Sequence, residues 1–241
     1  MPGDRNNRST TRGAPLGERK AAKPAGRPRG RPPKDLGAGD TSRDKLLDVA
    51  IDLFAAYGYD PVSTAAVADA AGLTQSMVHY HFGTKEQLWK SAIDRLMRRR
   101  GRFFPVSRLE FADIGPVDRL RILIRRLVEA NAAEPNYARI LMHEAMAGTP
   151  RLDWLMERFV GPGFAAFDEA VRDALAAGLI RPLPAHDITN IVTSAASLTL
   201  SIGAVTQWVY GIDVADEAHV RSLSDSIATI LLNGLLPPPQ T

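Results

Sequence analysis

Side chains able to hydrogen-bond to DNA are concentrated in residues 64–88, TAAVADAAGLTQSMVHYHFGTKEQL. Their order predicts a short helix, a glycine turn, a second short helix ending in aromatic residues, and a third, freshly capped helix. A protein that reads the major groove needs this order, because the second helix enters the groove while the first crosses the backbone. The stretch therefore indicates a transcription regulator.

Side chains that could serve catalysis do not converge elsewhere in the sequence. His143-Glu144 and His186-Asp187 are adjacent pairs, but neighbours on a helix point about 100° apart and do not form a shared site. The sequence contains no glycine-rich phosphate loop, no metal-spaced histidine cluster and no cysteine. We therefore expect no enzymatic activity, no cofactor and no metal site.

The first helix of the predicted DNA reader and its turn follow from local preferences. Thr64 is expected to be the N-cap, because its side-chain oxygen can accept from a free backbone N–H. Residues 65–71 are rich in alanine and favour a helix. Gly72 then suits a helix C-terminus where the backbone turns through positive φ.

The second helix is expected to run from Gln75 to about His81, with Thr74 as its cap. Val78 and Phe82 are four residues apart, so both should point inward. Together the two short helices predict a helix-turn-helix.

The third helix begins directly afterwards. Thr84 with Gln87 three residues later predicts a capping box. Lys85 opposes the helix dipole in the first turn, which is favourable when an anion such as a DNA phosphate lies nearby. A solvated surface lysine is the alternative interpretation.

These features together resemble the TetR family of bacterial regulators, over about Thr41–Met97. The resemblance includes an opening helix whose core stripe is expected to comprise Leu46, Val49, Ala50, Leu53, Phe54 and Tyr57. The matching positions are Tyr57-Gly58-Tyr59, Thr64, Ala71-Gly72-Leu73, Phe82, Lys85-Glu86 and Leu88. The resemblance implies an all-α fold, with an N-terminal helix-turn-helix domain and a helical ligand-binding and dimerisation domain.

The resemblance also implies which residues contact DNA. Thr74, Gln75 and Ser76 lie at the N-terminal end of the second helix, which usually meets base edges. Gln75 could bind an adenine edge in bidentate fashion. Contacts to phosphates, which fix register without reading sequence, are implied for Thr64, Tyr80 and Lys85.

Two residues of the second helix depart from the family pattern. His79 stands where the family usually has Tyr, and Ser76 where it often has Gly. Both bear on which operator is read and not on whether DNA is bound. His79 is interpreted either as a DNA contact or as a packed structural residue, whereas His81 is expected to lie partly buried beside Phe82.

Charge is distributed unevenly along the 241 residues. Residues 1–40 carry ten Lys and Arg against four Asp and Glu, residues 41–110 ten against eight, and residues 111–241 ten against fifteen. A basic end and an acidic remainder are expected of a DNA binder with a separate sensing or assembly domain. We predict a disordered basic arm (1–40), the helix-turn-helix domain (41–100), and a helical effector-binding and dimerisation domain (101–241).

The basic arm contains Pro-Arg-Gly-Arg-Pro at positions 28–32, which resembles an AT-hook. Gly30 lets the backbone lie flat in a narrow groove, and Arg29 and Arg31 would meet the negative potential of A-tracts. The alternative is a generic basic arm that raises affinity by counterion release. At the end of the third helix, residues 98–102 (RRRGR) are expected to complement the helix dipole, with an auxiliary phosphate contact as the alternative.

From Val117 onward the sequence predicts helices separated by Pro and Gly. The expected helices are 118–133, 136–147, 152–160, 163–177, 185–210 and 216–232. The last two suit a four-helix dimer interface, helped by the small residues Ala195, Ala196, Ser201, Gly203 and Ala204. Phe164, Phe167, Val171 and Leu175 form a stripe that could join this interface or an intramolecular core.

Polar or aromatic residues at apolar positions are the candidates for an effector pocket. They are Asn131, Tyr137, His143, Glu144, Asn190, Gln207, Trp208 and Tyr210. For each of them a role in the core or the interface is the alternative. Residues 143–150 also resemble the sensing domains of a TetR subgroup that includes RutR-like regulators.

The sequence gives no sign of a signal peptide or a membrane span. Residues 188–208 lack charge but contain nine Asn, Thr, Ser and Gln residues, so a buried helix in a dimer is expected there. We expect a cytoplasmic homodimer, nucleoid-associated when bound, that represses transcription from a palindromic double-stranded operator until a small-molecule effector releases it. The alternative is an architectural DNA-binding protein without an effector.

Overall fold

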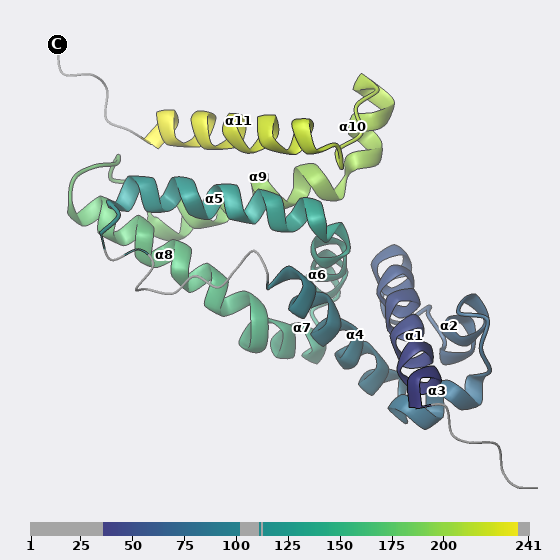
Figure 1. Ribbon diagram of the computed structural model, residues 1–241. Helices are drawn as coiled ribbons and strands as arrows, with labels where there is room; N and C mark the ends of the chain where they lie inside the picture. The colour runs from purple at the N-terminus through teal and green to yellow at the C-terminus, as the bar shows by residue number, and fades with distance from the viewer. Residues whose placement is uncertain (1–35, 102–110, 112, 236–241) are drawn as a thin grey trace, which may run out of the picture. The chain divides into compact units, whose positions relative to one another are not determined.

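The computed structural model describes residues 36–101, 111 and 113–235, and its regular elements over that range are all helical (Figure 1). The predicted all-α fold is therefore confirmed. The helices are α1 (Leu36–Tyr57), α2 (Thr64–Ala70), α3 (Gln75–Phe82), α4 (Lys85–Arg100), α5 (Pro116–Ala133), α6 (Pro135–Ala147), α7 (Pro150–Leu155), the π-helical turn η2 (Met156–Val160), α8 (Gly161–Ala176), α9 (Ala185–Ser201), α10 (Gly203–Tyr210) and α11 (Glu217–Leu235).

A first hydrophobic core joins α1–α4 to the helices that follow α5. Phe54, Leu88 and Trp89 are fully buried in it, because α1 and α4 pack against each other. Residues from α6, α7 and η2 enter the same core, including Ile140 and Leu155. Helix α1 thus packs against α6 as well as against α4.

The buried side chains of α1 and the start of this helix differ from the prediction. Tyr57 is 63% exposed, whereas Leu47 and Ile51 are fully buried. The helix presents a broader apolar face than the predicted stripe, because α2, α4 and α6 contact it. It also begins at Leu36 instead of near Thr41.

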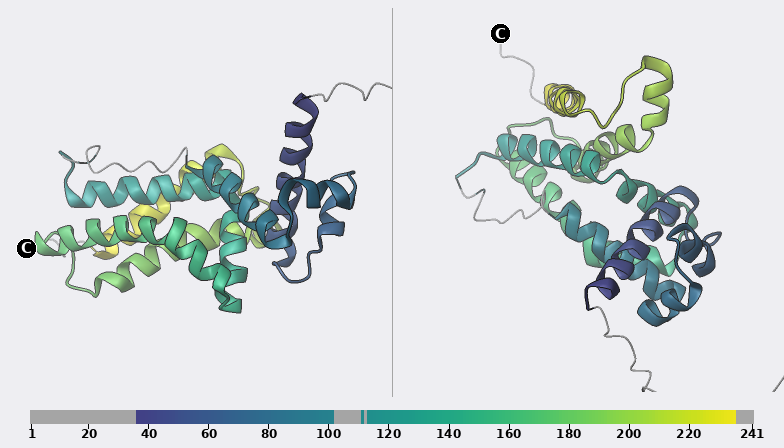
Figure 2. Two further views of the ribbon diagram at one scale, coloured as in Figure 1. Left: turned by 90° about the horizontal axis from the view of Figure 1, so that it is seen from below. Right: turned by 45° about the vertical axis from the view of Figure 1, so that its right-hand side comes forward.

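A second core is built around α5, which lies between α11 and α8 (Figures 1 and 2). All the predicted apolar side chains of α5 are buried, together with Ala130 and Asn131: Leu120, Leu123, Ile124, Leu127 and Val128. Phe167 and Val171 of α8 are buried against them within the same chain, while Phe164 and Leu175 are half-buried. The phenylalanine stripe therefore serves mainly as intramolecular core.

The predicted helix 185–210 is broken into two. Helix α9 ends at Ser201, and α10 leaves it at an angle of 64°. Gly203 is buried at the bend, where a Cβ would collide with the side chain of Val214. Of the small residues expected to face a partner, Ala196 and Gly203 are therefore buried within the subunit.

Among the described residues, no individual helix has both the length and the apolarity to cross a membrane. Helices α9 and α10 reach that length and composition only as a bent pair.

Candidate nucleic-acid interface

The helix α2 is capped by Ser63 and not by Thr64. The Ser63 side chain accepts a hydrogen bond from the Ala66 amide at 3.0 Å, and Thr64 is the first helical residue. Both residues can cap a helix, so the sequence did not distinguish them. At the other end, Gly72 has φ of +64°, and the Leu73 amide bonds the Ala68 carbonyl at 2.9 Å, which closes the tight turn.

One side of helix α3 packs against the core, and the opposite side is exposed to solvent. Val78 and Phe82 are buried, as predicted from their spacing. The side chains predicted to contact bases or phosphates are exposed around the opposite surface: Thr74, Gln75, Ser76, His79 and Tyr80. Helix α3 thus holds a polar, accessible face, here called the α3 face, on a rigid apolar support.

Gln75 is held by two hydrogen bonds at the start of α3. Its Nε2 donates to Thr64 Oγ1 at 3.2 Å and lies 3.5 Å from His79 Nε2. His79 Nδ1 lies 3.0 Å from the Gly83 carbonyl, which can only accept, so Nδ1 carries the proton and Nε2 accepts. Gln75 must therefore give up one of these bonds to bind an adenine edge with both of its groups.

The two remaining polar residues at the start of α3 are bonded to each other. Thr74 Oγ1 and Ser76 Oγ are 2.8 Å apart. Thr74 has the extended backbone of an N-cap, but its side chain makes no cap hydrogen bond. Its hydroxyl is directed to the neighbouring side chain, so both hydroxyls remain on the accessible α3 face.

His79 and His81 have different surroundings. His79 is exposed, so of its two interpretations the packed one is wrong. His81 is half-buried, with its ring 5.9 Å from that of Phe82, as expected. Burial, with a smaller effect of the Arg43 charge, lowers the pKa of His81.

Lys85 begins α4 and is half-buried. Its Nζ donates to the Asp60 carbonyl at 3.0 Å and lies 4.2 Å from the centre of the Tyr59 ring. Burial lowers the pKa of Lys85, against the opposing effect of Asp60. The Thr84 hydroxyl accepts from the Gln87 amide at 3.1 Å, which confirms the predicted cap.

Tyr59 is enclosed by a second cation that sequence reasoning missed. The Arg151 guanidinium lies 3.8 Å from the ring centre. Glu144, only 2% exposed, accepts from Arg151 at 3.1 Å and from the Thr149 hydroxyl at 2.7 Å. Glu144 therefore ties α6 to α7, and through Arg151 to Tyr59 in the loop before α2, which is a role in the core, the alternative given for it. No local pattern pairs residues 59 and 151, so only the fold reveals the contact.

Two arginines in the last turns of α4 bind carboxylates of other helices. Arg95 and Arg99 donate to Asp48 of α1 at 2.8 Å each, and Arg99 also pairs with Glu134 at 2.7 Å. Hydrogen bonding to Arg95 is the largest cause of the lowered pKa of Asp48. Arg99 thus ties α4 to α1 and to Glu134, the residue between α5 and α6.

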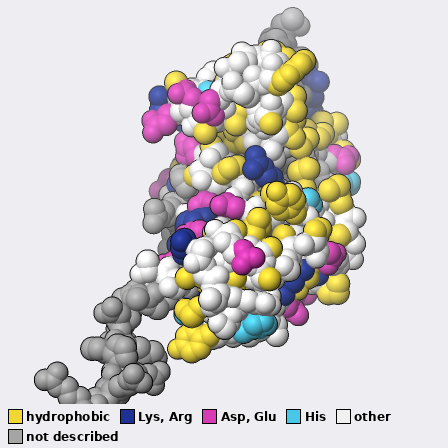
Figure 3. All heavy atoms as spheres, turned by 90° about the vertical axis from the view of Figure 1, so that its right-hand side faces the viewer, with side chains coloured by type: hydrophobic (Ala, Val, Ile, Leu, Met, Phe, Trp, Pro, Cys, Tyr) yellow, Lys and Arg dark blue, Asp and Glu magenta, His cyan; other side chains and the backbone are white. Residues whose placement is uncertain are grey.

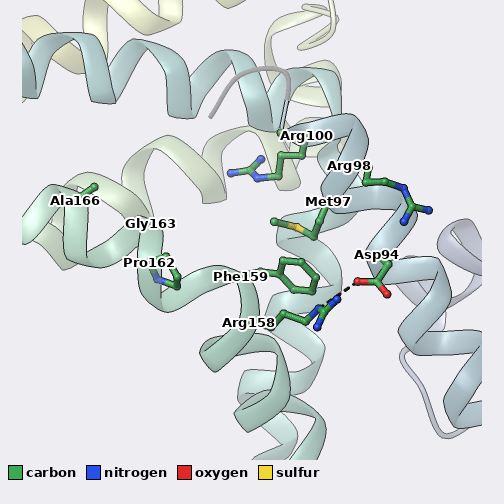
Figure 4. A pocket seen from close by; sticks show the side chains of 10 residues that line it. Asp94, Met97, Arg98, Arg100, Arg158, Phe159, Pro162, Gly163 and Ala166 are labelled. Atoms are coloured by element: carbon green, nitrogen blue, oxygen red, sulfur yellow. Dashed lines mark hydrogen bonds and ion pairs between the residues drawn. The ribbon is translucent and has the colours of Figure 1, made fainter. Parts of the chain in front are cut away.

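Arg100, the last residue of α4, is 5% exposed. Its Nη1 donates to Asn131 Oδ1 at 2.7 Å, and its guanidinium lies 3.9 Å from the centre of the Tyr137 ring. Burial lowers the pKa of Arg100. Figure 4 shows the Arg100 and Met97 side chains extending toward α8, while Arg98 points away from it. Arg102 of the same basic run lies outside the described residues.

An apolar cavity of about 360 Å³ lies between α4, α5, α6, η2, α8 and α9. Its lining is mainly aliphatic and aromatic, and includes Leu127, Leu141, Phe159, Phe164 and Leu198. We call this space the apolar cavity. Of the eight predicted ligand residues, Tyr137 lines it, and Asn131 lies behind its wall bonded to Arg100 and to Ser197.

The other predicted ligand residues lie elsewhere. Trp208 and Tyr210 are 88% and 72% exposed on α10, and Asn190 and Gln207 are exposed as well. The bend after α9 carries residues 207–210 away from the core, which period counting could not foresee. His143 packs against Gly58 instead, where a Cβ would lie 3.2 Å from its Nδ1.

One expected feature, the AT-hook-like arm, cannot be placed. Arg29 and Arg31 of the AT-hook-like arm lie outside the described residues. Within residues 36–101, 111 and 113–235 there is no cluster of three His, Asp or Glu side chains that could bind a metal ion. Figure 3 shows basic, acidic and hydrophobic side chains interspersed across the face in view, with no continuous basic surface.

Comparison with known proteins decides the family. Residues 46–92 match the bacterial regulatory proteins of the tetR family, and residues 116–230 match the tetracyclin repressor-like C-terminal domain. The chain belongs to the TetR family. As a member of this family it is a DNA-binding transcriptional regulator and not an enzyme.

Curated TetR-family relatives match most of the chain. The transcriptional regulator RutR of Escherichia coli (strain K12) is 22% identical over 197 residues, which cover 80% of this chain and 89% of RutR. The transcriptional repressor SCO4008 of Streptomyces coelicolor is 26% identical over 192 residues, covering 78% and 92%. These relatives share both domains of the chain.

Solved structures show the same fold. KstR2 of Mycobacterium tuberculosis, a ketosteroid transcriptional regulator, superposes with a TM-score of 0.61 at 20% identity, covering 81% of this chain and 95% of KstR2. FadR of Bacillus subtilis, solved with stearoyl-CoA, gives a TM-score of 0.57 at 16% identity, covering 79% and 98%.

Proposed function

We propose that this TetR-family chain is a homodimeric repressor that reads a palindromic operator through the α3 face and is released by a small molecule. The α3 face carries the proposal, since five hydrogen-bonding residues stand exposed on a helix anchored by Val78 and Phe82. A two-fold dimer presents two such helices to successive half-sites about one turn of DNA apart.

Specific residues are assigned to specific parts of the duplex. Gln75 and Ser76, with Thr74, would contact base edges, and His79 would join them through its accessible edge. Thr64, Tyr80 and Lys85 would contact phosphates. Lys85 can do so while bonded to Asp60, because an ammonium has three donors.

Gln75→Ala tests the assignment of base contacts. With an operator selected from random duplexes, the variant should lose about tenfold or more in affinity, since one bidentate base contact discriminates by about 1–3 kcal/mol. Gln207→Ala, the same change at an exposed position of α10, should leave the affinity unchanged. Full affinity of Gln75→Ala, measured by fluorescence anisotropy, would refute the role of Gln75.

Helices α9 and α11 are proposed as the dimer surface. Ile191 of α9 and Ile230 of α11 are 59% and 71% exposed and line one groove of about 340 Å³. Exposed apolar side chains gathered in a groove mark an interaction site. In sedimentation experiments the double variant Ile191→Asp, Ile230→Asp should be a monomer. Met146→Asp, a control at a 76% exposed position of α6, should remain a dimer.

The N-terminal arm is proposed to add minor-groove contacts beside the operator. Arg29 and Arg31 flank Gly30 within a proline-bounded stretch, which suits insertion into A·T-rich DNA. Deleting residues 1–36 should weaken binding and flatten its salt dependence. Unchanged affinity and salt dependence would show that the arm does not contact DNA.

The apolar cavity is proposed as the effector site. It borders α4, whose first residue follows α3 and whose last residue, Arg100, lines the cavity. A rigid helix of 16 residues transmits displacement over about 24 Å. A ligand that prefers one position of Arg100 would thereby shift the spacing of the two recognition helices.

A further inference from the structure

The apolar cavity adjoins a second, basic cavity. The basic cavity has a volume of about 530 Å³ and is lined by Arg98, Arg100 and Arg158 together with Asp94 and smaller residues. Arg158 pairs with Asp94 at 3.3 Å. The two cavities share Met97, Arg100, Phe159 and Gly163, so they meet at the end of α4.

Arg100 lies at the boundary between the apolar cavity and the basic cavity. Among the described residues that line the apolar cavity, Arg100 carries the only charge. Thr193, Ser194 and Ser197 supply the polar groups on α9, and the rest of that lining is Gly163 and apolar or aromatic side chains. A ligand with an apolar body and one polar end therefore matches this arrangement. Its body fits the apolar cavity, and its polar end fits the boundary with the basic cavity.

The Arg100 guanidinium is fixed in place by neighbours on two helices. Asn131 of α5 accepts from Nη1 at 2.7 Å, and Tyr137 of α6 lies against the guanidinium plane. Asn131 is itself held by bonds to the Ala196 carbonyl and Ser197 hydroxyl, at 3.1 and 3.0 Å. A pre-oriented guanidinium binds a planar carboxylate more tightly than a mobile one, because less entropy is lost on binding.

We propose that the effector is an apolar carboxylate whose body fills the apolar cavity and whose carboxylate binds the Arg100 guanidinium. This inference rests on the proposed effector role of the apolar cavity and adds the chemical class of the ligand. A neutral molecule of the same shape would make only the weaker hydrogen bonds of an uncharged acceptor to Arg100. A cation would be repelled by Arg100 and, beyond it, by Arg98 and Arg158 of the basic cavity.

The test compares matched pairs of small molecules on the full-length protein. Decanoate and decanamide share an aliphatic body, and 2-naphthoate and 2-naphthamide share an aromatic one. Dissociation constants come from displacement of 8-anilinonaphthalene-1-sulfonate, followed by fluorescence without DNA. At least one carboxylate should bind about tenfold or more tightly than its amide, since hydrogen bonds between ionised partners are about twice as strong as neutral ones.

Variants locate the preference at Arg100. In Arg100→Gln the carboxylate and amide should bind alike, and in Arg100→Lys the preference should be reduced but present. Arg172→Gln, which removes an exposed arginine of α8 that lines neither cavity, should keep the full preference. The wild-type comparison needs no variant, so the test stands even if Arg100→Gln does not fold.

Three results would overturn the proposal. They are equal binding of carboxylates and amides, a carboxylate preference that survives Arg100→Gln, and absence of binding by all four compounds. Operator binding, measured separately, tests the proposed function. A protein that binds its operator but shows no carboxylate preference keeps its proposed function and loses only this ligand class.

Discussion

Lys85 and Arg100 begin and end the same helix, yet their surroundings differ. Lys85 lies beside the α3 face with one donor on a backbone carbonyl, whereas Arg100 is buried among α5, α6 and the apolar cavity. Lys85 bonds Asp60, 25 positions away in the loop before α2, and Arg100 bonds Asn131, 31 positions away on α5. The contrast separates the proposed DNA-contacting surface from the proposed effector site.

Breaking the buried link between the two parts should have the largest effect on stability. Glu144→Gln leaves the Arg151 cation without its carboxylate in a nearly closed site. Loss of one partner of a buried ion pair costs about 3 kcal/mol. Urea unfolding should show that loss, and Glu217→Gln, whose i,i+4 pair is exposed, should change stability by less than about 0.5 kcal/mol. Equal small effects would mean that Glu144 does not hold the two parts together.

Salt dependence sharpens the contrast between the two ends of α4. Lys85→Met should reduce the slope of log K against log salt by about one, because one phosphate contact is lost. Arg99→Met should leave the slope unchanged, since Asp48 and Glu134 already engage that guanidinium. Operator titrations between low and moderate salt measure both slopes. If only Arg99→Met reduced the slope, Arg99 and not Lys85 would be the residue that contacts a phosphate.

Acid should weaken the attachment of α4 to α1. The Arg95 hydrogen bond lowers the pKa of Asp48 below its unfolded value of 3.8, so the pair stabilises the fold above that pH. The contribution is lost as the pH falls through the lowered value. Asp48→Asn should lower stability by about 1 kcal/mol at pH 7 and make it less sensitive to acid below pH 4. Unfolding curves at pH 7 and pH 3.5 check this.

His81 should give the smallest effect. Burial lowers its pKa in the folded protein below 6.5, so the unfolded chain binds the proton more readily. Stability contributed above pH 6.5 is therefore lost as the pH falls below it. His81→Gln should narrow the difference in melting temperature between pH 7.5 and pH 5.5. An unchanged difference would assign that pH dependence to other groups.

The contrast also explains what could be predicted from the sequence. The α3 helix, its buried Val78 and Phe82, and the cap at Thr84 follow from spacing and capping within a few residues. The buried roles of Glu144 and Arg100 depend on partners from distant helices. Their residue types alone could not reveal those partners, and Glu144 was predicted as a ligand residue for that reason.

Trp208 is a second residue whose surroundings could not be predicted from the local sequence. Its helical spacing was continuous with α9, but the chain bends by 64° between α9 and α10, and Trp208 is exposed. The bend brings Gly203 so close to Val214, eleven positions away, that a side chain would not fit there, and no periodic pattern records this contact.

Selection of bound duplexes from a random pool, by the full-length chain and by the chain lacking residues 1–36, tests the central claim most directly. We predict a palindromic motif that survives the truncation, with A·T-rich flanks that are lost. Only A·T-rich, non-palindromic enrichment that disappears on truncation would contradict operator reading by the α3 face and favour an architectural DNA-binding protein.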